Sequence, residues 1–323
     1  MSFQHQNSWS RRNFLGALAA GGVALPQPTF ANRPSRVAEK AVSLHVFSKH
    51  LQFLDYEATA RAAAEIGFDG VDLAVRPKGH VLPENVTTDL PRAVAALKQA
   101  GLQALLMTTA IMDPAAATAA TVLETAHQQG ITHYRTNWLR YDQENVNLPE
   151  SLKGYRKQLT TLAELNRKTN MIGGYQNHSG EHYVGAPVWD IATLLNEINS
   201  PHLGSQYDIR HATAEGGQAW PLGLDLIHPR INSLVIKDFR WEKGGDQWKI
   251  VNVPLGEGMV DFSKFFSLLK KYDVRCPISV HFEYELPGEK EEMDVAERTE
   301  KTIAVMRKDV TALQKYLDEA GLG

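Results

Sequence analysis

The segment from Gly204 to His211, with the sequence GSQYDIRH, carries the residue types in this chain that most directly suggest chemistry. Gln206 and Asp208 stand two positions apart, and on a β-strand such residues share one face. Arg210 and His211 follow at the predicted carboxyl end of the strand. An amide, a carboxylate, a guanidinium and an imidazole together can bind a polar substrate and exchange protons with it. Taken alone, however, the segment is better explained by a capping aspartate in an ordinary turn.

Other predicted strands end in similar polar side chains. These are Asp72, Arg76 and His80 after the second strand, Gln176, Asn177 and His178 after the fifth, Lys237 and Asp238 after the seventh, and His281, Glu283 and Glu285 on the eighth. If the strands form a barrel, their carboxyl ends meet at one mouth. Burying so many polar groups without a ligand would cost free energy, so together they predict a functional site.

Each of these residues also has a purely structural interpretation. Arg76, which precedes Pro77, could pair with a surface acid, and His80 could be an ordinary loop histidine. Lys237 and Asp238 could close the end of their strand as an ion pair. Glu283 is the hardest to explain in this way, because an acid within PISVHFEYEL would point into a barrel that otherwise needs apolar layers.

The elements that would position these residues form a repeated unit of a short apolar strand and an amphipathic helix. We expect strands at 42–47, 70–75, 103–109, 133–138, 171–178, 204–208, 231–238 and 277–286, and helices at 60–66, 90–100, 114–129, 148–168, 188–198, 222–227, 262–272 and 291–317. This alternation predicts a single (β/α)8 TIM barrel over residues 41–323. A β-hairpin insertion is expected at about 239–258. A doubly wound open sheet fits less well, because no glycine-rich phosphate turn follows the first strand.

The first 31 residues have the pattern of a twin-arginine export signal. Arg11 and Arg12 precede an apolar run from Phe14 to Leu25, which is too short for a permanent membrane anchor. Residues 32–40 are predicted to be a linker. We therefore expect the twin-arginine export machinery to carry the folded chain to the periplasm.

Composition excludes several other classes. Cys276 is the only cysteine, so the chain cannot form an internal disulfide or a cysteine metal cluster. The formal net charge is −3 and no basic block follows the leader, which disfavours nucleic acid as a partner. The remaining expectation is a small-molecule ligand. The sequence leaves open whether the protein is a homo-oligomer.

The order of the motifs QNH, D-x-x-H, VIKD and a glutamate on the last strand, together with the turn GEGMVDF, resembles a known family. It is similar to the xylose isomerase-like TIM barrels, which include sugar isomerases, epimerases and inosose dehydratase, and the resemblance covers essentially the whole predicted mature chain. In the sugar epimerases, a divalent ion is held by Glu, Asp, His and Glu at the ends of strands five to eight. By position, Asp208 and Glu283 match two of these ligands, and His211 matches a histidine that contacts substrate. Gln176 and Val235 replace the other two ligands.

The resemblance therefore implies a divalent metal (Mn, Mg, Co or Zn) held by Gln176, Asp208 and Glu283. A metal-free site is the alternative, because the replaced ligands remove a charge and an imidazole.

The loss of one carboxylate also favours a reaction with a single base. We expect Glu283 to abstract a proton next to a carbonyl, His178 or His211 to act as the partner acid, and Lys237 with Arg76 to stabilise the oxyanion.

The predicted substrate-binding residues are Arg76, His80, Asn177, Arg210, Asp238 and His281. The expected protein is an exported isomerase or epimerase for a sugar or keto-sugar. The alternatives are a lyase acting on an oxidised glycoside and a non-catalytic carbohydrate-binding barrel with a degenerate metal site.

Overall fold

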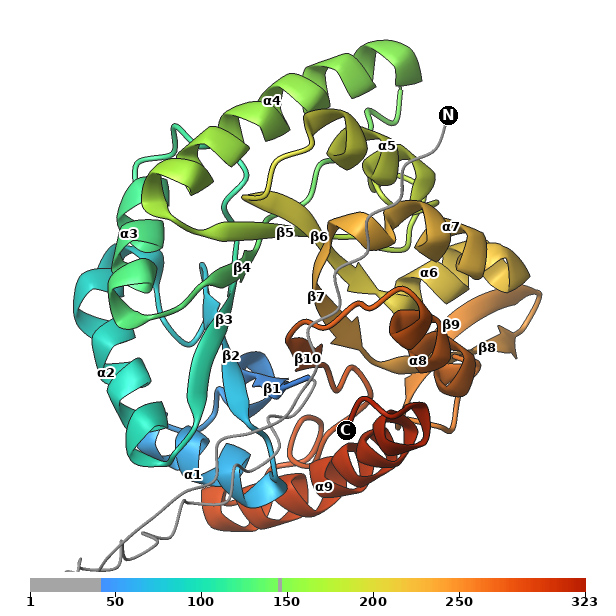
Figure 1. Cartoon of the computed structure of the whole chain (residues 1–323). Helices are drawn as coiled ribbons and strands as arrows, with labels where there is room; N and C mark the ends of the chain where they lie inside the picture. Colours follow the sequence, from blue (N-terminus) through green and yellow to red (C-terminus); the bar gives the residue numbers. More distant parts are fainter. Residues whose placement is uncertain (1–41, 145–146) are drawn as a thin grey trace, which may run out of the picture. The chain divides into compact units, whose positions relative to one another are not determined.

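The computed structural model describes residues 42–144 and 147–323, so the predicted export signal (1–31) and linker (32–40) lie outside the described residues. The predicted parallel strands form a closed barrel (Figure 1). Its strands, in the order in which they pair, are β1 (Leu44–Phe47), β2 (Gly70–Val75), β3 (Gln103–Thr109), β4 (His133–Arg135), β5 (Ile172–Gln176), β6 (Leu203–Asp208), β7 (Ile231–Ile236) and β10 (Ile278–Val280). β10 pairs with β1 and thereby closes the barrel. The prediction of a (β/α)8 barrel is confirmed.

Helices surround the barrel on its outer side (Figure 1). They are α1 (Tyr56–Ile66), α2 (Val86–Gln99), α3 (Ala119–Gln129), α4 (Leu148–Thr169), α5 (Trp189–Ile198), α6 (Ile209–Gly216), α7 (Trp220–Ile227), α8 (Phe262–Lys271) and α9 (Val295–Ala320), with short 3₁₀ helices at Ser48–Leu51, Pro83–Asn85, Gly217–Ala219 and His228–Arg230. Local sequence sets several helix ends. Asp55, for example, accepts the backbone N–H of Ala58 at the start of α1, and Gly67 ends this helix at φ 106°. Among the described residues, no helix is long and apolar enough to cross a membrane.

The structure corrects several predicted boundaries. The expected strand 277–286 ends at Val280, so His281 and Glu283 lie in the segment that follows β10. The helix expected from residue 114 begins at Ala119. Arg210 and His211 belong to helix α6 rather than to a loop, because Asp208 accepts the backbone N–H of His211 and thereby caps the helix.

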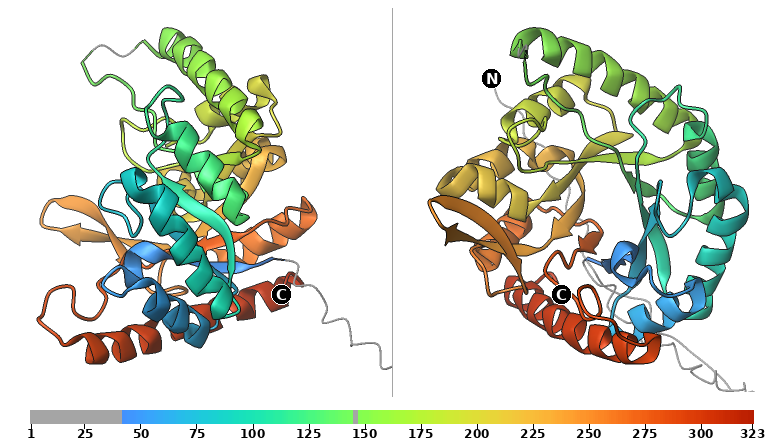
Figure 2. Two further views of the ribbon diagram at one scale, coloured as in Figure 1. Left: turned by 90° about the vertical axis from the view of Figure 1, so that its left-hand side faces the viewer. Right: turned by 180° about the vertical axis from the view of Figure 1, so that it is seen from behind.

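The expected hairpin insertion consists of β8 (Asp238–Gly244) and β9 (Gln247–Val253), which pair antiparallel. In the left view of Figure 2 it extends from the same end of the barrel as the loop that precedes α9. This is the end at which strand β7 finishes. The hairpin therefore stands beside the mouth formed by the carboxyl ends of the strands.

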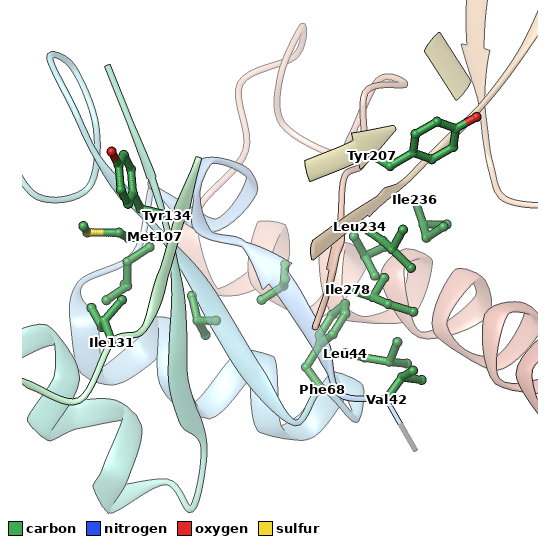
Figure 3. Packing of buried hydrophobic residues seen from close by; sticks show 14 of the residues in the cluster. Val42, Leu44, Phe68, Met107, Ile131, Tyr134, Tyr207, Leu234, Ile236 and Ile278 are labelled. Carbon is green, nitrogen blue, oxygen red and sulfur yellow. The ribbon is translucent and has the colours of Figure 1, made fainter. Parts of the chain in front are cut away.

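The main apolar core lies between the barrel and its helices. Figure 3 shows Leu234, Ile236 and Ile278, from the neighbouring strands β7 and β10, together on one side of the sheet. Tyr207 is fully buried on β6 and its ring stacks on that of Phe265 in α8, with 6.1 Å between the ring centroids. Since neighbouring residues on a strand face opposite ways, the alternate positions of β6 are left for Gln206 and Asp208, which face the inside of the barrel.

Candidate active site

Asp208 lies at the carboxyl end of β6 and is fully buried. Its Oδ2 atom accepts a hydrogen bond from Gln176 Nε2 at 2.8 Å and lies 3.2 Å from Lys237 Nζ. Its Oδ1 atom accepts the backbone N–H of His211 at 3.1 Å. Gln176 Oε1 in turn accepts from Arg135 Nη1 at 3.3 Å, so the amide bridges a cation and an anion. These contacts provide the hydrogen-bond donors that both oxygens of a buried carboxylate require.

Lys237 and His211 form the second part of this cluster. Both side chains are buried, and Lys237 Nζ lies 2.9 Å from His211 Nε2. The other ring nitrogen of His211, Nδ1, lies 2.7 Å from Ser179 Oγ and 2.9 Å from Arg210 Nη1. Burial first, and then the charge of Lys237, holds the pKa of His211 well below its usual value. His211 is therefore a neutral imidazole placed between two cations.

Arg210 and His178 surround His211. Arg210 Nη1 donates to Ser179 Oγ at 2.9 Å, and its Nη2 donates to Asn252 Oδ1 of the hairpin at 2.6 Å. The His178 ring lies 4.0 Å from the His211 ring, measured between centroids. Burial lowers the pKa of His178 to about 4. The two imidazoles are thus adjacent and neutral near pH 7, so either one can accept a proton but neither carries one to donate as an imidazolium.

Glu283 is the carboxylate at the edge of this cluster, with 28% of its side chain exposed. Its Oε2 atom lies 3.5 Å from Lys49 Nζ, and its Oε1 atom lies 3.7 Å from Nδ1 of the buried His281. Burial alone would raise the pKa of Glu283, but His281 and the charges of Lys237 and Lys49 together hold this pKa well below its ordinary range. Glu283 is therefore ionised and available as a base throughout the physiological pH range.

A layer of buried polar groups lies next to Glu283 and His281. Ser279 Oγ donates to Asp72 Oδ2 at 2.6 Å, and Thr108 Oγ1 donates to the same oxygen at 3.1 Å. His281 Nε2 lies 3.2 Å from Ser279 Oγ. Burial raises the pKa of Asp72 to about 6, which is well above that of an ordinary aspartate. This layer links β2, β3 and β10 across the barrel interior.

Two guanidinium groups lie on the β2–β4 side of the mouth. Arg135 at the end of β4 is 4% exposed, lies over the Trp138 ring at 4.3 Å and donates through Nη2 to the backbone oxygen of Thr109. Burial, and next the charge of Arg76, lowers the pKa of Arg135 to about 10. Arg76 lies over the ring of Phe47 at 5.5 Å. The positive charge of Arg76 thus disfavours the ionised form of Arg135.

The structure gives three of the predicted substrate-binding residues contacts that hold the fold together. Asp238 accepts four backbone N–H groups, from Phe239, Gly256, Gly258 and Val260, and so holds the loop that follows the hairpin. Asn177 exchanges two hydrogen bonds with the backbone of Asp208 and thereby joins the ends of β5 and β6. His80 lies 2.9 Å, through Nε2, from the backbone oxygen of Leu54. The other predicted site residues lie in or beside the cluster.

Four residues of the cluster and its surroundings were not predicted from the sequence, namely Arg135, Lys49, His50 and Ser179. Arg135 could have been found, because a basic residue within a buried strand is a signal of the same kind as Glu283. Lys49 and His50 stand in a 3₁₀ turn after β1, and His50 Nε2 accepts the backbone N–H of Phe282 at 3.1 Å. No motif marks these two residues or Ser179 in the sequence.

The residues at the ends of β5–β7 and after β10 do not fit a divalent cation. In residues 42–144 and 147–323, no group of three or more His, Cys, Asp or Glu side chains is placed to hold a metal ion. Arg135 can only donate, so Gln176 must turn its oxygen toward Arg135 and its NH2 group toward Asp208. The Lys237 ammonium already lies against the Asp208 oxygen, and Val235 offers no ligand atom. A cation would meet a positively charged group at this position.

The protein is a (β/α)8 barrel with polar side chains at the carboxyl ends of its strands. This is the end at which such barrels carry their active sites. A model of the family described as xylose isomerase-like TIM barrel matches residues 60–309. The chain belongs to this family. A comparison with curated proteins gives no match.

Solved structures with the same fold include a sugar epimerase and a probable dehydratase. D-Allulose 3-epimerase from Methylomonas sp. in complex with D-allulose has a TM-score of 0.62 at 15% identity, over 86% of this chain and 98% of that one. The probable 3-DHS dehydratase involved in petrobactin synthesis from Bacillus anthracis has a TM-score of 0.62 at 14% identity, over 84% and 98% of the two chains. A xylose isomerase-like TIM barrel protein from Mycobacterium smegmatis in complex with magnesium has a TM-score of 0.62 at 12% identity, over 87% and 99%.

Proposed function

We propose that this chain is a sugar isomerase or epimerase that moves a proton at a carbon next to a carbonyl group. The observation that carries the proposal is the buried contact of Lys237 with Asp208 and His211 beside the ionised carboxylate of Glu283. A base and a fixed positive charge are the two features that enolisation of a keto-sugar requires. The family and its sugar epimerases support the assignment of substrate class.

Each residue has a defined role in this reaction. Glu283 takes the proton from the carbon, and the electron pair of the broken C–H bond moves onto the carbonyl oxygen. Glu283 then returns the proton to a carbon of the enediolate as the oxygen's electron pair re-forms a carbonyl group. Lys237 stabilises the negative charge on this oxygen. Because the pKa of Glu283 is low, Glu283 is a weak base, and the stabilisation by Lys237 must offset this weakness. Asp208 fixes the position of the ammonium group.

His178 and His211 act at the substrate oxygens in this proposal. Both rings are neutral, so their role is to pass a proton between the carbonyl and hydroxyl oxygens of the substrate. His211 lies within hydrogen-bond distance of the Lys237 ammonium and the Ser179 hydroxyl, and both groups can take part in this transfer. The proposed reaction needs no divalent cation, because Lys237 supplies the positive charge that a metal supplies elsewhere.

The test is solvent proton exchange on a panel of keto-sugars in heavy water, followed by NMR. Wild-type protein should incorporate deuterium at one carbon next to the carbonyl, and dialysis against a chelator should leave this rate unchanged. Glu283→Gln should lower the rate by about 10²–10⁴-fold. Glu285→Gln is the matched control, since Glu285 lies two residues away and pairs with Lys290. Full exchange by Glu283→Gln, with the control behaving like wild type, would disprove the assignment.

A second candidate is a lyase or dehydratase acting on an oxidised glycoside. Gln176 stands where a second carboxylate is expected, so Glu283 is the single carboxylate base, which suits abstraction followed by elimination. The similarity in fold to a probable dehydratase is compatible with this reaction. An unsaturated product with new ultraviolet absorbance would identify the lyase, whereas an epimer of the substrate would identify the epimerase. If every sugar binds without exchange or product, the chain is a carbohydrate-binding barrel.

We also propose that the protein is exported to the periplasm by the twin-arginine route. The support is the order of Arg11, Arg12 and an apolar run in the sequence. Replacement of both arginines by lysine should retain the protein in the cytoplasmic fraction of cells, whereas the unchanged protein should fractionate with the periplasm. Equal fractionation of the two proteins would refute the proposal.

A further inference from the structure

We infer that the substrate is a sugar acid, whose carboxylate binds Arg76 and Arg135 on the β2–β4 side of the mouth while its carbonyl group faces Lys237. This inference rests on the proposed function and narrows its substrate class. Among the described residues, some charged side chains at the mouth have a partner of opposite charge, and others have none. Asp208 contacts Lys237, and Glu283 contacts Lys49, but neither acid lies within ion-pair distance of Arg76 or Arg135.

The hydrogen-bonding state of the two arginines points to a missing anion. In residues 42–144 and 147–323, Arg76 makes no side-chain hydrogen bond and no ion pair, so its whole fork of donors is free. Arg135 is almost fully buried, yet its hydrogen-bond partners are the neutral oxygens of Gln176 and Thr109, and its Nε atom has no partner within the described chain. Arg76 directly follows Val75, which pairs with Thr109 of β3, and Arg135 donates to the backbone oxygen of the same Thr109, so both guanidinium groups belong to one side of the mouth. A buried guanidinium without an ion-pair partner is costly until a negative charge binds to it.

Asp72 does not supply that charge directly. It is a buried acid whose charge, together with that of Glu283, favours the ionised form of Arg135. Its Oδ2 atom, however, accepts hydrogen bonds from Ser279 and Thr108, and neither of its oxygens forms an ion pair with an arginine of the described residues. Asp72 therefore leaves the donors of the two guanidinium groups available to a ligand.

The location of the pair fits one end of a small substrate. Arg76 lies over Phe47, and Phe47 stacks on His281 with 4.6 Å between the ring centroids. His281 lies against Glu283, the proposed base. Arg135 contacts Gln176, which contacts Asp208. Arg76 is thus linked to the base through Phe47 and His281, and Arg135 is linked to the Asp208–Lys237 pair through Gln176.

The structure favours a carboxylate over a phosphate as the anionic group. In barrels of this type, phosphate groups bind most often to backbone N–H groups of the loops after strands seven and eight. Here the backbone N–H groups of Gly256, Gly258 and Val260, in the loop after the seventh barrel strand, already donate to Asp238. What remains free is the planar fork of Arg76, and a carboxylate matches this geometry with two parallel hydrogen bonds.

The experiment measures binding by calorimetry with glucuronate, glucose and glucose 6-phosphate, using the full chain. Glucuronate should bind at least tenfold more tightly than glucose and more tightly than the phosphate, and Arg76→Gln should weaken glucuronate binding by about 10–100-fold. Arg76→Lys should retain part of the affinity, because the charge stays but the fork is lost. Arg92→Gln is the matched control, since Arg92 also lies over an aromatic ring, that of Tyr56 at 5.8 Å, and should leave binding unchanged.

Other outcomes overturn the inference. Equal affinity for glucuronate and glucose, tighter binding of glucose 6-phosphate, or unchanged glucuronate binding by Arg76→Gln would each refute the carboxylate site. These results are distinct from a failure of the proposed function. If neutral keto-sugars exchange deuterium without any preference for acids, the carboxylate site alone is wrong. If glucuronate binds as expected but no keto-acid sugar exchanges deuterium, the proposed reaction alone is wrong.

Discussion

Replacement of Lys237 by methionine tests the central contact of the proposed site. Methionine keeps most of the side-chain length but removes the charge that lies 3.2 Å from Asp208 Oδ2 and 2.9 Å from His211 Nε2. If Lys237 stabilises the oxyanion, the rate of deuterium exchange should fall by about 10²–10³-fold, which is the usual cost of losing one such group. The affinity for substrate should fall much less, because the charge on the oxygen develops in the transition state.

The same substitution should destabilise the protein. Asp208 is fully buried, and removal of the partner of a buried ion costs about 3–5 kcal/mol in free energy of unfolding. Part of this loss should be recovered, because His211 can then take a proton and pair with Asp208, whose Oδ2 lies 3.6 Å from its Nε2. Urea denaturation followed by circular dichroism measures this loss, and Lys243→Met in the exposed hairpin is the control.

A double variant separates stability from catalysis. Asp208→Asn combined with Lys237→Met removes both charges, so its stability should recover most of the loss seen in Lys237→Met. Its exchange rate should remain low, because the positive charge is still absent. If Lys237→Met exchanges deuterium at the wild-type rate, Lys237 is not the group that stabilises the oxyanion. If the double variant is no more stable than Lys237→Met, the ion pair does not hold this part of the barrel.

Two further predictions follow from the other buried groups. Burial lowers the pKa of His45 and of His281 to about 4, so the unfolded chain binds protons that the folded chain excludes, and the free energy of unfolding should decrease as the pH falls from about 6.5 to about 4. The shift corresponds to roughly 3 kcal/mol for each histidine, and Asp72, whose pKa is raised to about 6, opposes the decrease below about pH 6. His45→Gln should make the stability less dependent on pH, as measured by urea denaturation at each pH. Asp238→Ala should lower the free energy of unfolding by about 3–5 kcal/mol, because the Asp238 carboxylate accepts hydrogen bonds from four backbone N–H groups. The sugar affinity measured by calorimetry should stay unchanged. A loss of sugar affinity without a loss of stability would instead make Asp238 a substrate ligand.

The fold could be predicted from the sequence because its signals are local. Apolar strands alternate with amphipathic helices, and residues such as Asp55 and Gly67 mark helix ends in a way that depends only on neighbouring backbone. The predicted length of β10 is too great for the same reason, since the run PISVHFEYEL has the composition of a longer strand. Only the pairing of β10 with β1 and β7 determines where this strand ends.

The sequence by itself determined that Gln176 and Asp208 lie on the inner face at the ends of their strands, because side chains alternate along a strand. Only the tertiary structure decided how they pair. Lys237 comes to lie against Asp208 because β6 and β7 are neighbours, and Arg76 and Arg135 come to the same side of the mouth because β3 pairs with both β2 and β4. Pairing depends on distances between segments far apart in the chain, and the protonation state of a buried group depends on the charges around it.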